Sequence, residues 1–347
     1  MVRASWRGIL PALALVVQAC QAVGPTAVPS SGPTPTPAGA PTAPGPTRAV
    51  RSGSQPYVAG APIELADLGG RVVFDDFEDL TAMDVNGSNV VRLANAAGPE
   101  FDGSWSPDGS EVVYRDSTRG INDNDEIFVV RSDGTGRRNL TNDPANDWGP
   151  DWSPDGSTIA FNSDRAGGVM GGYLMHPDGS DVRRIDVPTW IEYPSWSPDG
   201  TRLAFMGAIG NDYEIFTIEL ATRTVTRLTH TPGQDGWPAW SPDGRTIAFS
   251  SMRDDCAFTG QAPECWRSGD IDPHRDVWQM DADGGHPRRV SPEFGQFVAW
   301  SPDGAYLLVT GYALYVIRPD GSGRLELRAA GIPRSLGGIP DWTDGSG

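Results

Sequence analysis

Aromatic and acidic residues recur together in this sequence, each time at a similar distance ahead of a repeated tryptophan. Five aromatic residues stand three or four positions before that tryptophan: Phe101, Trp148, Tyr193, Trp237 and Phe297. Four acidic residues stand one or two positions from them: Asp102, Asp147, Glu192 and Asp235. Aromatic faces beside carboxylates can bind cationic groups, peptides or stacked sugars. The structural alternative is that the rings pack between neighbouring repeats while the acids cap loop backbone.

The tryptophan itself belongs to a repeated hexapeptide. The copies are SWSPDG at Trp105, DWSPDG at Trp152, SWSPDG at Trp196, AWSPDG at Trp240 and AWSPDG at Trp300, with a degenerate DWTDGS at Trp342. Successive tryptophans are 47, 44, 44, 60 and 42 residues apart, and a period of about 40 to 50 residues is typical of propeller blades. Pro presets φ, Asp bonds nearby backbone and Gly accepts the left-handed conformation, which together predict a tight turn. We assign the tryptophans a structural role, packing one blade against the next.

Each repeat contains enough strand-forming sequence for four strands. A short apolar run such as STIAF follows every hexapeptide, and a second unit such as EIFVVRSDGTGRRNLT then reads as strand, turn and strand. Four of the five second turns contain Asp-Gly, a strong hairpin signal. Four antiparallel strands per repeat are a propeller blade.

The two ends of the array complement each other. The segments GRVVFDD from Gly70 and LTAMDVNGSNVVRLA from Leu80 match the second to fourth strands of a blade, but no hexapeptide precedes them. The segment GIPDWTDG near the C-terminus supplies the missing first strand. We therefore predict an all-β, six-bladed propeller of four-stranded antiparallel blades, whose last blade is closed by N- and C-terminal segments, leaving no free edge.

These repeats resemble the WD40-like (PD40) repeats of the TolB-like six-bladed β-propellers. The resemblance rests on WSPDG followed by IAF and on EIFVV followed by DG and RR, and it covers about Arg71 to Gly345. It implies the same fold over a propeller domain that we place at 63–347. The sequence departs from TolB itself, which carries an α/β domain where this chain has a low-complexity segment.

The N-terminal segment has the layout of an export signal followed by a tether. Residues 1–19 contain Arg3 and Arg7 and then a short apolar run, as in a signal peptide. The sequence VVQAC resembles a bacterial lipobox and predicts lipid attachment at Cys20; an ordinary cleaved signal peptide is the alternative. Residues 20–62 then form a Pro/Thr-rich disordered stalk. We expect an exported protein, anchored by its lipid to the outer face of the cytoplasmic membrane or to an outer membrane.

The other two cysteines fall in the one irregular interval. Cys256 and Cys265 lie in an insertion that lengthens the fourth interval to 60 residues. In an exported protein such a pair predicts a disulfide, and two cysteines are too few for a zinc site.

Charge and motif content narrow the functions. With 45 acidic and 27 basic residues the net charge is −18, which opposes binding to nucleic acid. The sequence contains neither G-x-S-x-G nor H-E-x-x-H. The acidic stretches at 122–128 and 281–285 lack the spacing of an EF-hand, so we expect ordinary acidic turns rather than Ca²⁺ sites, and we predict no cofactor.

These observations favour a monomeric, non-catalytic binding or scaffolding propeller whose ligand is a protein, peptide or glycan. The long, variable loops share one face of the propeller, where the aromatic and acidic residues above would surround the mouth of the channel. The alternative is a carbohydrate-active hydrolase or lyase that uses mouth carboxylates such as Asp147 and Asp235 as acid and base.

Overall fold

The computed structural model describes residues 60–345, apart from gaps at 77–78, 95–97, 118–123, 188, 211, 232, 254–274, 292–294, 312 and 329–337. The predicted signal peptide, Cys20, most of the stalk and the Cys256–Cys265 pair lie outside the described residues. Within the described part, no helix is long and apolar enough to cross a bilayer. The short 3-10 helix η2 (Leu65–Asp67) precedes the first strand.

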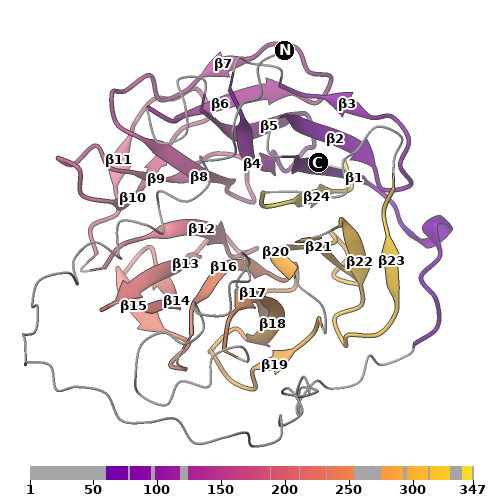
Figure 1. The fold of residues 1–347 in the computed structure, drawn as a ribbon. Helices are drawn as coiled ribbons and strands as arrows, with labels where there is room; N and C mark the ends of the chain where they lie inside the picture. The colour runs from indigo at the N-terminus through magenta and orange to yellow at the C-terminus, as the bar shows by residue number, and fades with distance from the viewer. Residues whose placement is uncertain are drawn as a thin grey trace, which may run out of the picture. The chain divides into compact units, whose positions relative to one another are not determined.

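The strands form six separate four-stranded antiparallel sheets arranged around a centre (Figure 1). Each sheet is one blade, and we name its strands a to d in chain order within a repeat. Blade 1 contains β4 (Glu100–Trp105), β5 (Glu111–Asp116), β6 (Glu126–Arg131) and β7 (Arg138–Asn139); blade 2 contains β8 (Asp147–Trp152), β9 (Ile159–Ser163), β10 (Gly171–Met175) and β11 (Arg183–Arg184); blade 3 contains β12 (Glu192–Trp196), β13 (Arg202–Ile209), β14 (Asp212–Glu219) and β15 (Thr224–Arg227).

Three further sheets complete the propeller. Blade 4 contains β16 (Asp235–Trp240), β17 (Thr246–Ser251), β18 (Asp276–Asp281) and β19 (Arg288–Arg289); blade 5 contains β20 (Gly295–Trp300), β21 (Leu307–Gly311), β22 (Tyr315–Ile317) and β23 (Arg324–Glu326); blade 6 contains β24 (Asp341–Thr343), β1 (Arg71–Asp75), β2 (Leu80–Asp84) and β3 (Val91–Arg92). The all-β, six-bladed fold predicted from the repeats is confirmed.

Blade 6 joins the two ends of the chain. Strand β24 pairs antiparallel with β1, with Trp342 opposite Val72. The a strands of successive blades also contact one another in a closed ring, including β24 with β4 and β20 with β24. Strands from opposite ends of the chain therefore close the ring, and β1 is paired on both sides, by β2 and by β24.

The repeated hexapeptide is a tight turn, as predicted. In the first copy the N–H of Gly109 donates to the carbonyl of Ser106 at 2.8 Å, and the hydroxyl of Ser106 donates to Asp108 Oδ1 at 2.6 Å. Gly109 has a φ of 67°, in the left-handed region that glycine adopts without a steric cost. These turns and the turns joining strands c and d lie on one face, the turn face; the mouth face is the opposite one.

Packing between blades forms the core. Trp105 packs among Val73, Leu80 and Tyr114, so it joins blade 1 to blade 6. Four of the six repeat tryptophans are at most 7% exposed: Trp105, Trp152, Trp240 and Trp342. Trp196 and Trp300 remain half-buried. The repeat tryptophans therefore pack between blades, but the blades differ in how much of the ring they bury.

Side chains on the a strands also link consecutive blades near the centre. The backbone N–H of Trp105 donates to Asp341 Oδ2 at 2.7 Å, and that of Trp196 donates to Asp151 Oδ2 at 2.8 Å. The hydroxyl of Ser104 donates to Asp151 Oδ1 at 3.0 Å. Burial, with a smaller contribution from the nearby carboxylate of Asp341, raises the pKa of Asp151 to about 7, although the hydrogen bonds that Asp151 accepts act against this.

Candidate functional site

In blades 1 to 5, strand a is irregular at the end that reaches the mouth face. Its pairing with strand b shifts register between Phe101 and Ser104 in blade 1, and equivalent shifts occur in blades 2 to 5. Such β-bulges bend a strand and redirect the side chain at the irregular position. The bulges lie at the positions where the sequence places its aromatic and acidic residues.

The residue three positions before the tryptophan adopts a left-handed conformation in four blades. Its φ is 57° at Asp102, 59° at Gly149, 49° at Tyr193 and 52° at Trp237. Glycine fits at this position in blade 2, but bulky aromatic residues rarely adopt a positive φ. A strained residue of this kind costs about 1–3 kcal/mol and is typical of functional sites. Blades 3 and 4 therefore hold two aromatic side chains in strained positions at the mouth.

Three of the five predicted aromatic residues form one group, the mouth cluster: Tyr193, Trp237 and Phe297. The ring centroids of Tyr193 and Trp237 are 5.7 Å apart, and those of Trp237 and Phe297 are 5.1 Å apart in an edge-to-face arrangement. Phe297 is buried, while Tyr193 and Trp237 are half-buried and keep part of their surface available. Phe101 is buried and Trp148 half-buried, and neither makes a ring contact with the cluster among the described residues.

Two arginines that the sequence analysis did not single out stand over these rings. The guanidinium of Arg275 lies 4.5 Å from the ring centroid of Trp237, and that of Arg115 lies 4.5 Å from Phe101. Burial lowers the pKa of Arg115, but the carboxylates of Asp102, Asp125 and Asp75 and the Tyr193 hydroxyl outweigh this and raise it. The mouth is therefore lined by cations on aromatic faces as well as by carboxylates.

Several buried polar atoms at the mouth lack a hydrogen-bond partner among the described residues. They are Asp102 Oδ2, Arg115 Nε and Trp237 Nε1. Arg115 Nε and Asp102 Oδ2 are 3.7 Å apart, which is an ion pair but not a hydrogen bond. Buried polar groups are normally satisfied, so a cluster of them at a channel mouth fits a site whose ligand or water supplies the missing partners.

The acidic residues do not share one environment. Glu192 is 8% exposed, and burial raises its pKa to about 7. Asp102 is 7% exposed, and burial raises its pKa while Arg115 partly opposes that effect. Both carboxyls lie at the bulges: Glu192 precedes Tyr193 of the mouth cluster, and Asp102 follows Phe101.

Asp147 and Asp235, by contrast, each pair with an arginine of the same blade. Arg165 Nη2 lies 3.0 and 2.9 Å from the two carboxylate oxygens of Asp147, and Arg253 Nη2 lies 2.6 Å from Asp235 Oδ2. Both carboxylates are fully buried. Burial raises the pKa of Asp147 to about 6 and also raises that of Asp235, and the arginines act against it. This geometry does not support the pair as the acid and base of a glycosidase, because neither carboxylate is open to a substrate.

Metal ligands are not gathered in the described part of the chain, where no group of three or more His, Cys, Asp or Glu side chains is placed to hold a metal ion. In the acidic stretch at 281–285, Asp283 accepts from the N–H of Gly285 at 2.9 Å, and Asp281 Oδ2 lies 2.8 Å from His286 Nδ1. Part of the other acidic stretch, 122–123, lies among the residues not described.

Some of the site features that were not predicted have a recognisable signal in the sequence. Asp147 precedes Arg165 by 18 residues, and Asp235 precedes Arg253 by the same 18, so a repeated acid–base spacing marked the two ion pairs. The bulges were marked by Gly149, which stands at the same distance from its tryptophan as Tyr193 and Trp237 from theirs. For Arg115 and Arg275 we find no comparable signal.

Solved structures with the same fold come from several sources. TolB from Acinetobacter baumannii is 20% identical and superposes with a TM-score of 0.61, covering 79% of this chain and 66% of that one. A putative TolB from Agrobacterium tumefaciens is 20% identical, with a TM-score of 0.57 and coverage of 75% and 88%. A chain of a nidogen/laminin complex is 10% identical, with a TM-score of 0.63 and coverage of 79% and 98%. This chain thus spans just under two thirds of the first of these structures.

The sequence itself supplies the family assignment. No curated protein sequence matches it. The TolB beta propeller domain (PD40) matches residues 72–193 and 186–261, which together are more than half of the chain. With the six-bladed fold and the repeated WSPDG turns already established, this match shows that the chain belongs to the TolB beta propeller domain (PD40) family.

Proposed function

We propose that this propeller is a non-catalytic binding module that holds a peptide segment of a partner protein at the mouth of its channel. The observation that carries the proposal is the strained placement of Tyr193 and Trp237, which projects two half-buried rings beside unpartnered polar atoms. The surrounding structure maintains strain of this kind, and such residues cluster at active and binding sites.

The chemistry of the mouth favours a peptide. Asp102 offers an acceptor, while Arg115 Nε and Trp237 Nε1 offer donors, and these atoms have no hydrogen-bond partner among the described residues. A peptide segment carries N–H and C=O groups that match both kinds, together with side chains that can pack on the mouth cluster. The nidogen/laminin structure supports a protein ligand by analogy, since a propeller of this fold occurs there in a protein complex.

The location of the module is the second part of the proposal. The signal peptide at 1–19 would export the chain, and lipid on Cys20 would anchor it outside the cytoplasmic membrane. The Pro/Thr-rich stalk would then hold the propeller away from the membrane at about 3.1 Å per residue. A Cys20→Ala variant should move from the membrane to the soluble fraction; unchanged fractionation would rule out the anchor without affecting the proposed binding site.

Quantitative co-purification tests the binding function. Full-length protein, the double variant Trp148→Ala/Trp237→Ala and the control Arg245→Ala/His286→Ala would be isolated from the same cells. The control residues are exposed and lie on the turn face. We expect the same partner with wild type and control, and its loss with the mouth variant. A partner retained equally by all three proteins would contradict a mouth site.

A glycan panel separates the remaining ligand classes. Binding of a glycan that is lost in the mouth variant would replace the peptide with a sugar at the same site. Turnover of a glycan that disappears in Asp235→Asn, with unchanged thermal stability, would establish the enzyme alternative instead.

A further inference from the structure

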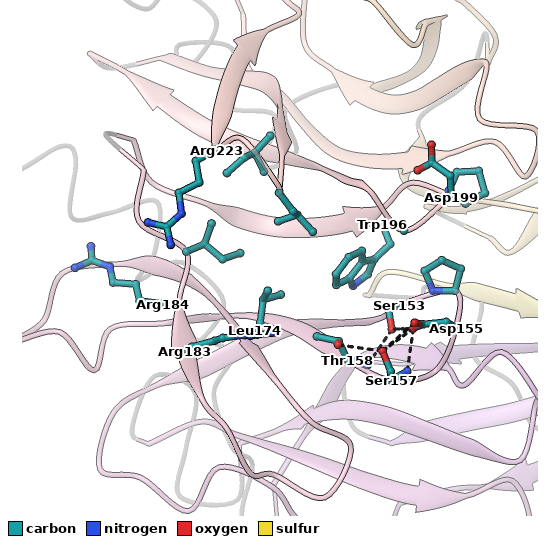
Figure 2. A pocket seen from close by; sticks show the side chains of 16 residues that line it. Ser153, Asp155, Ser157, Thr158, Leu174, Arg183, Arg184, Trp196, Asp199 and Arg223 are labelled. Carbon is teal, nitrogen blue, oxygen red and sulfur yellow. Dashed lines mark hydrogen bonds between the residues drawn. The ribbon is translucent and has the colours of Figure 1, made fainter.

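A groove lies between blades 2 and 3 on the turn face, away from the mouth cluster (Figure 2). Its volume is about 570 Å³, within the range of ligand sites. The floor is apolar and includes Leu174, Ile185, Ile218 and the half-buried indole of Trp196. Figure 2 shows the indole near the serine and aspartate side chains of one turn, with arginines toward the outer end.

The groove is open because of one residue. In blades 3 and 6 the residue that starts strand b is arginine, and its guanidinium covers the tryptophan of the next blade. Arg202 lies 4.5 Å from the ring centroid of Trp240, and Arg71 lies 5.1 Å from that of Trp105. The covered tryptophans are only 7% and 4% exposed. Thr158 occupies the same position in blade 2 and is too short to cover Trp196.

Blade 4 supports this explanation. Thr246 stands at the equivalent position there, and the next tryptophan, Trp300, is also half-buried. Trp196 and Trp300, for which the preceding blade has threonine at this position, are therefore the two that remain partly exposed. The other four repeat tryptophans, for which the preceding blade has arginine, glutamate or tyrosine there, are at most 7% exposed. The exposure of the repeat tryptophans therefore varies with the residue at this position of the preceding blade.

Threonine at position 158 also leaves Arg183 without the cross-sheet ion pair that its counterpart in blade 1 makes. In blade 1 the equivalent residue is Glu111, which forms an ion pair with Arg138 at 3.3 Å across the sheet. Arg183 is the blade 2 counterpart of Arg138, and Thr158 cannot pair with it. The one ion pair of Arg183 within the described residues is with the exposed Asp181 of its own turn, at 3.7 Å. Exposed pairs of this length contribute little.

Blade 3 adds a second arginine from an atypical turn. The turn between β14 and β15 lacks the Asp-Gly or Asn-Gly that the other blades have there, and it carries Arg223, which has a φ of 59°. Arg223 Nη1 reaches Asp186 of blade 2 at 3.6 Å, with both side chains more than 60% exposed. Arg183 and Arg223 thus stand on opposite walls of the groove, each held by a weak pair that a ligand carboxylate can replace.

We propose that this groove is a second binding site, for an extended acidic segment of a partner protein. An apolar side chain of the segment packs on Trp196 between the two blades, and a neighbouring carboxylate pairs with Arg183 and Arg223. Charge complementarity at the outer end selects this occupant, because three of the lining residues there are arginines, the third being Arg184. The two carboxylates of the lining, Asp155 and Asp199, lie at the other end, where hydroxyl and backbone N–H groups of their own turns bind them. The site is separate from the mouth site and does not depend on it.

Restoring the missing cover gives a specific test. Thr158→Arg should close the groove by stacking over Trp196, as Arg202 does over Trp240. Thr246→Arg makes the same change between blades 4 and 5 and is the matched control. Random peptides displayed on phage would be selected on immobilised full-length protein, and the enriched peptides would be synthesised for titration against each variant.

We expect enriched peptides with Asp or Glu within two positions of a large apolar residue. Thr158→Arg should weaken their binding by about tenfold or more, and Thr246→Arg by less than about twofold, since hot-spot contacts are concentrated in few residues. Their affinity should also fall as salt rises, because the pairing is exposed. Enriched peptides that bind Thr158→Arg as tightly as wild type, or that lose binding only in the mouth variant Trp148→Ala/Trp237→Ala, would overturn the proposal, as would enrichment without acidic residues.

Discussion

The backbone N–H of Trp105 donates a 2.7 Å hydrogen bond to Oδ2 of Asp341, a residue 236 positions further along the chain. It is one of the contacts that join the first complete blade to the last. Asp341→Ala should lower the free energy of unfolding by about 2–3 kcal/mol, because the bond is charge-assisted and its loss leaves a buried N–H unpaired. Asp341→Asn retains an acceptor and should cost less. Chemical denaturation measures both; equal costs, or none, would show that this bond does not secure the closure.

The carboxyls near the channel predict a specific pH dependence. Asp151 has a raised pKa of about 7, so the folded state binds its proton more tightly than the unfolded state does. The contribution to stability is therefore complete below pH 4 and is lost as the pH rises through 7. Asp151→Asn has no such titration, so the stability of the variant relative to wild type should improve by about 2–3 kcal/mol between pH 5 and 8. A constant difference across that range, measured by urea unfolding, would show that Asp151 is ionised normally.

A substitution at the bulge residue Trp237 should affect binding more than stability. Asparagine accepts a left-handed conformation more readily than tryptophan, so Trp237→Asn releases strain while it removes the ring contacts of the mouth cluster. We expect a loss of stability well below the roughly 3–5 kcal/mol of an ordinary buried Trp→Ala change, together with loss of the partner. The comparison variant is Phe297→Ala. Because Phe297 does not have a left-handed φ, this variant relieves no strain and should show the larger loss of stability. The reverse order would argue that the bulge stores no strain.

The sequence predicts the fold well because the fold is periodic. Each WSPDG turn specifies its own conformation through Pro, Asp and Gly, and a turn repeated at blade spacing leaves few alternatives to a propeller. The closure by β24 follows from counting strands. What periodicity does not show is how side chains from different strands meet. Asp147 and Asp235 looked like ligand-binding acids because their partners, Arg165 and Arg253, are 18 residues away, just after the neighbouring strand of the same blade.

Departures from the repeat proved as informative as the repeat. Blade 2 has Thr158 where blades 1 and 3 have Glu111 and Arg202, and the shorter side chain leaves the groove beside Trp196 open. Left-handed conformations at Tyr193 and Trp237 depend on the register shift between strands, which involves contacts across the sheet and is not encoded in either residue alone.

The ion pair of Asp235 predicts a structural role that mutation can test. Arg253→Met leaves a fully buried carboxylate without its guanidinium and should cost about 3–5 kcal/mol. The double variant Arg253→Met/Asp235→Asn removes the unpaired charge and should recover much of that loss. Thermal unfolding of both variants gives the comparison. If the double variant is no more stable than Arg253→Met alone, the carboxylate does not depend on Arg253, and the mouth acids would need a different account.

Site-specific photo-crosslinking tests the central claim, that a partner peptide binds at the mouth, most directly. A photoreactive phenylalanine analogue would replace Trp237 in the full-length protein, and a second protein would carry it at His286, whose side chain is 91% exposed on the turn face. Irradiation in cells should give a discrete adduct containing a partner polypeptide from position 237 and none of that mass from position 286. The same adduct from both positions, or none from position 237 while the protein remains folded, would contradict a peptide-binding mouth.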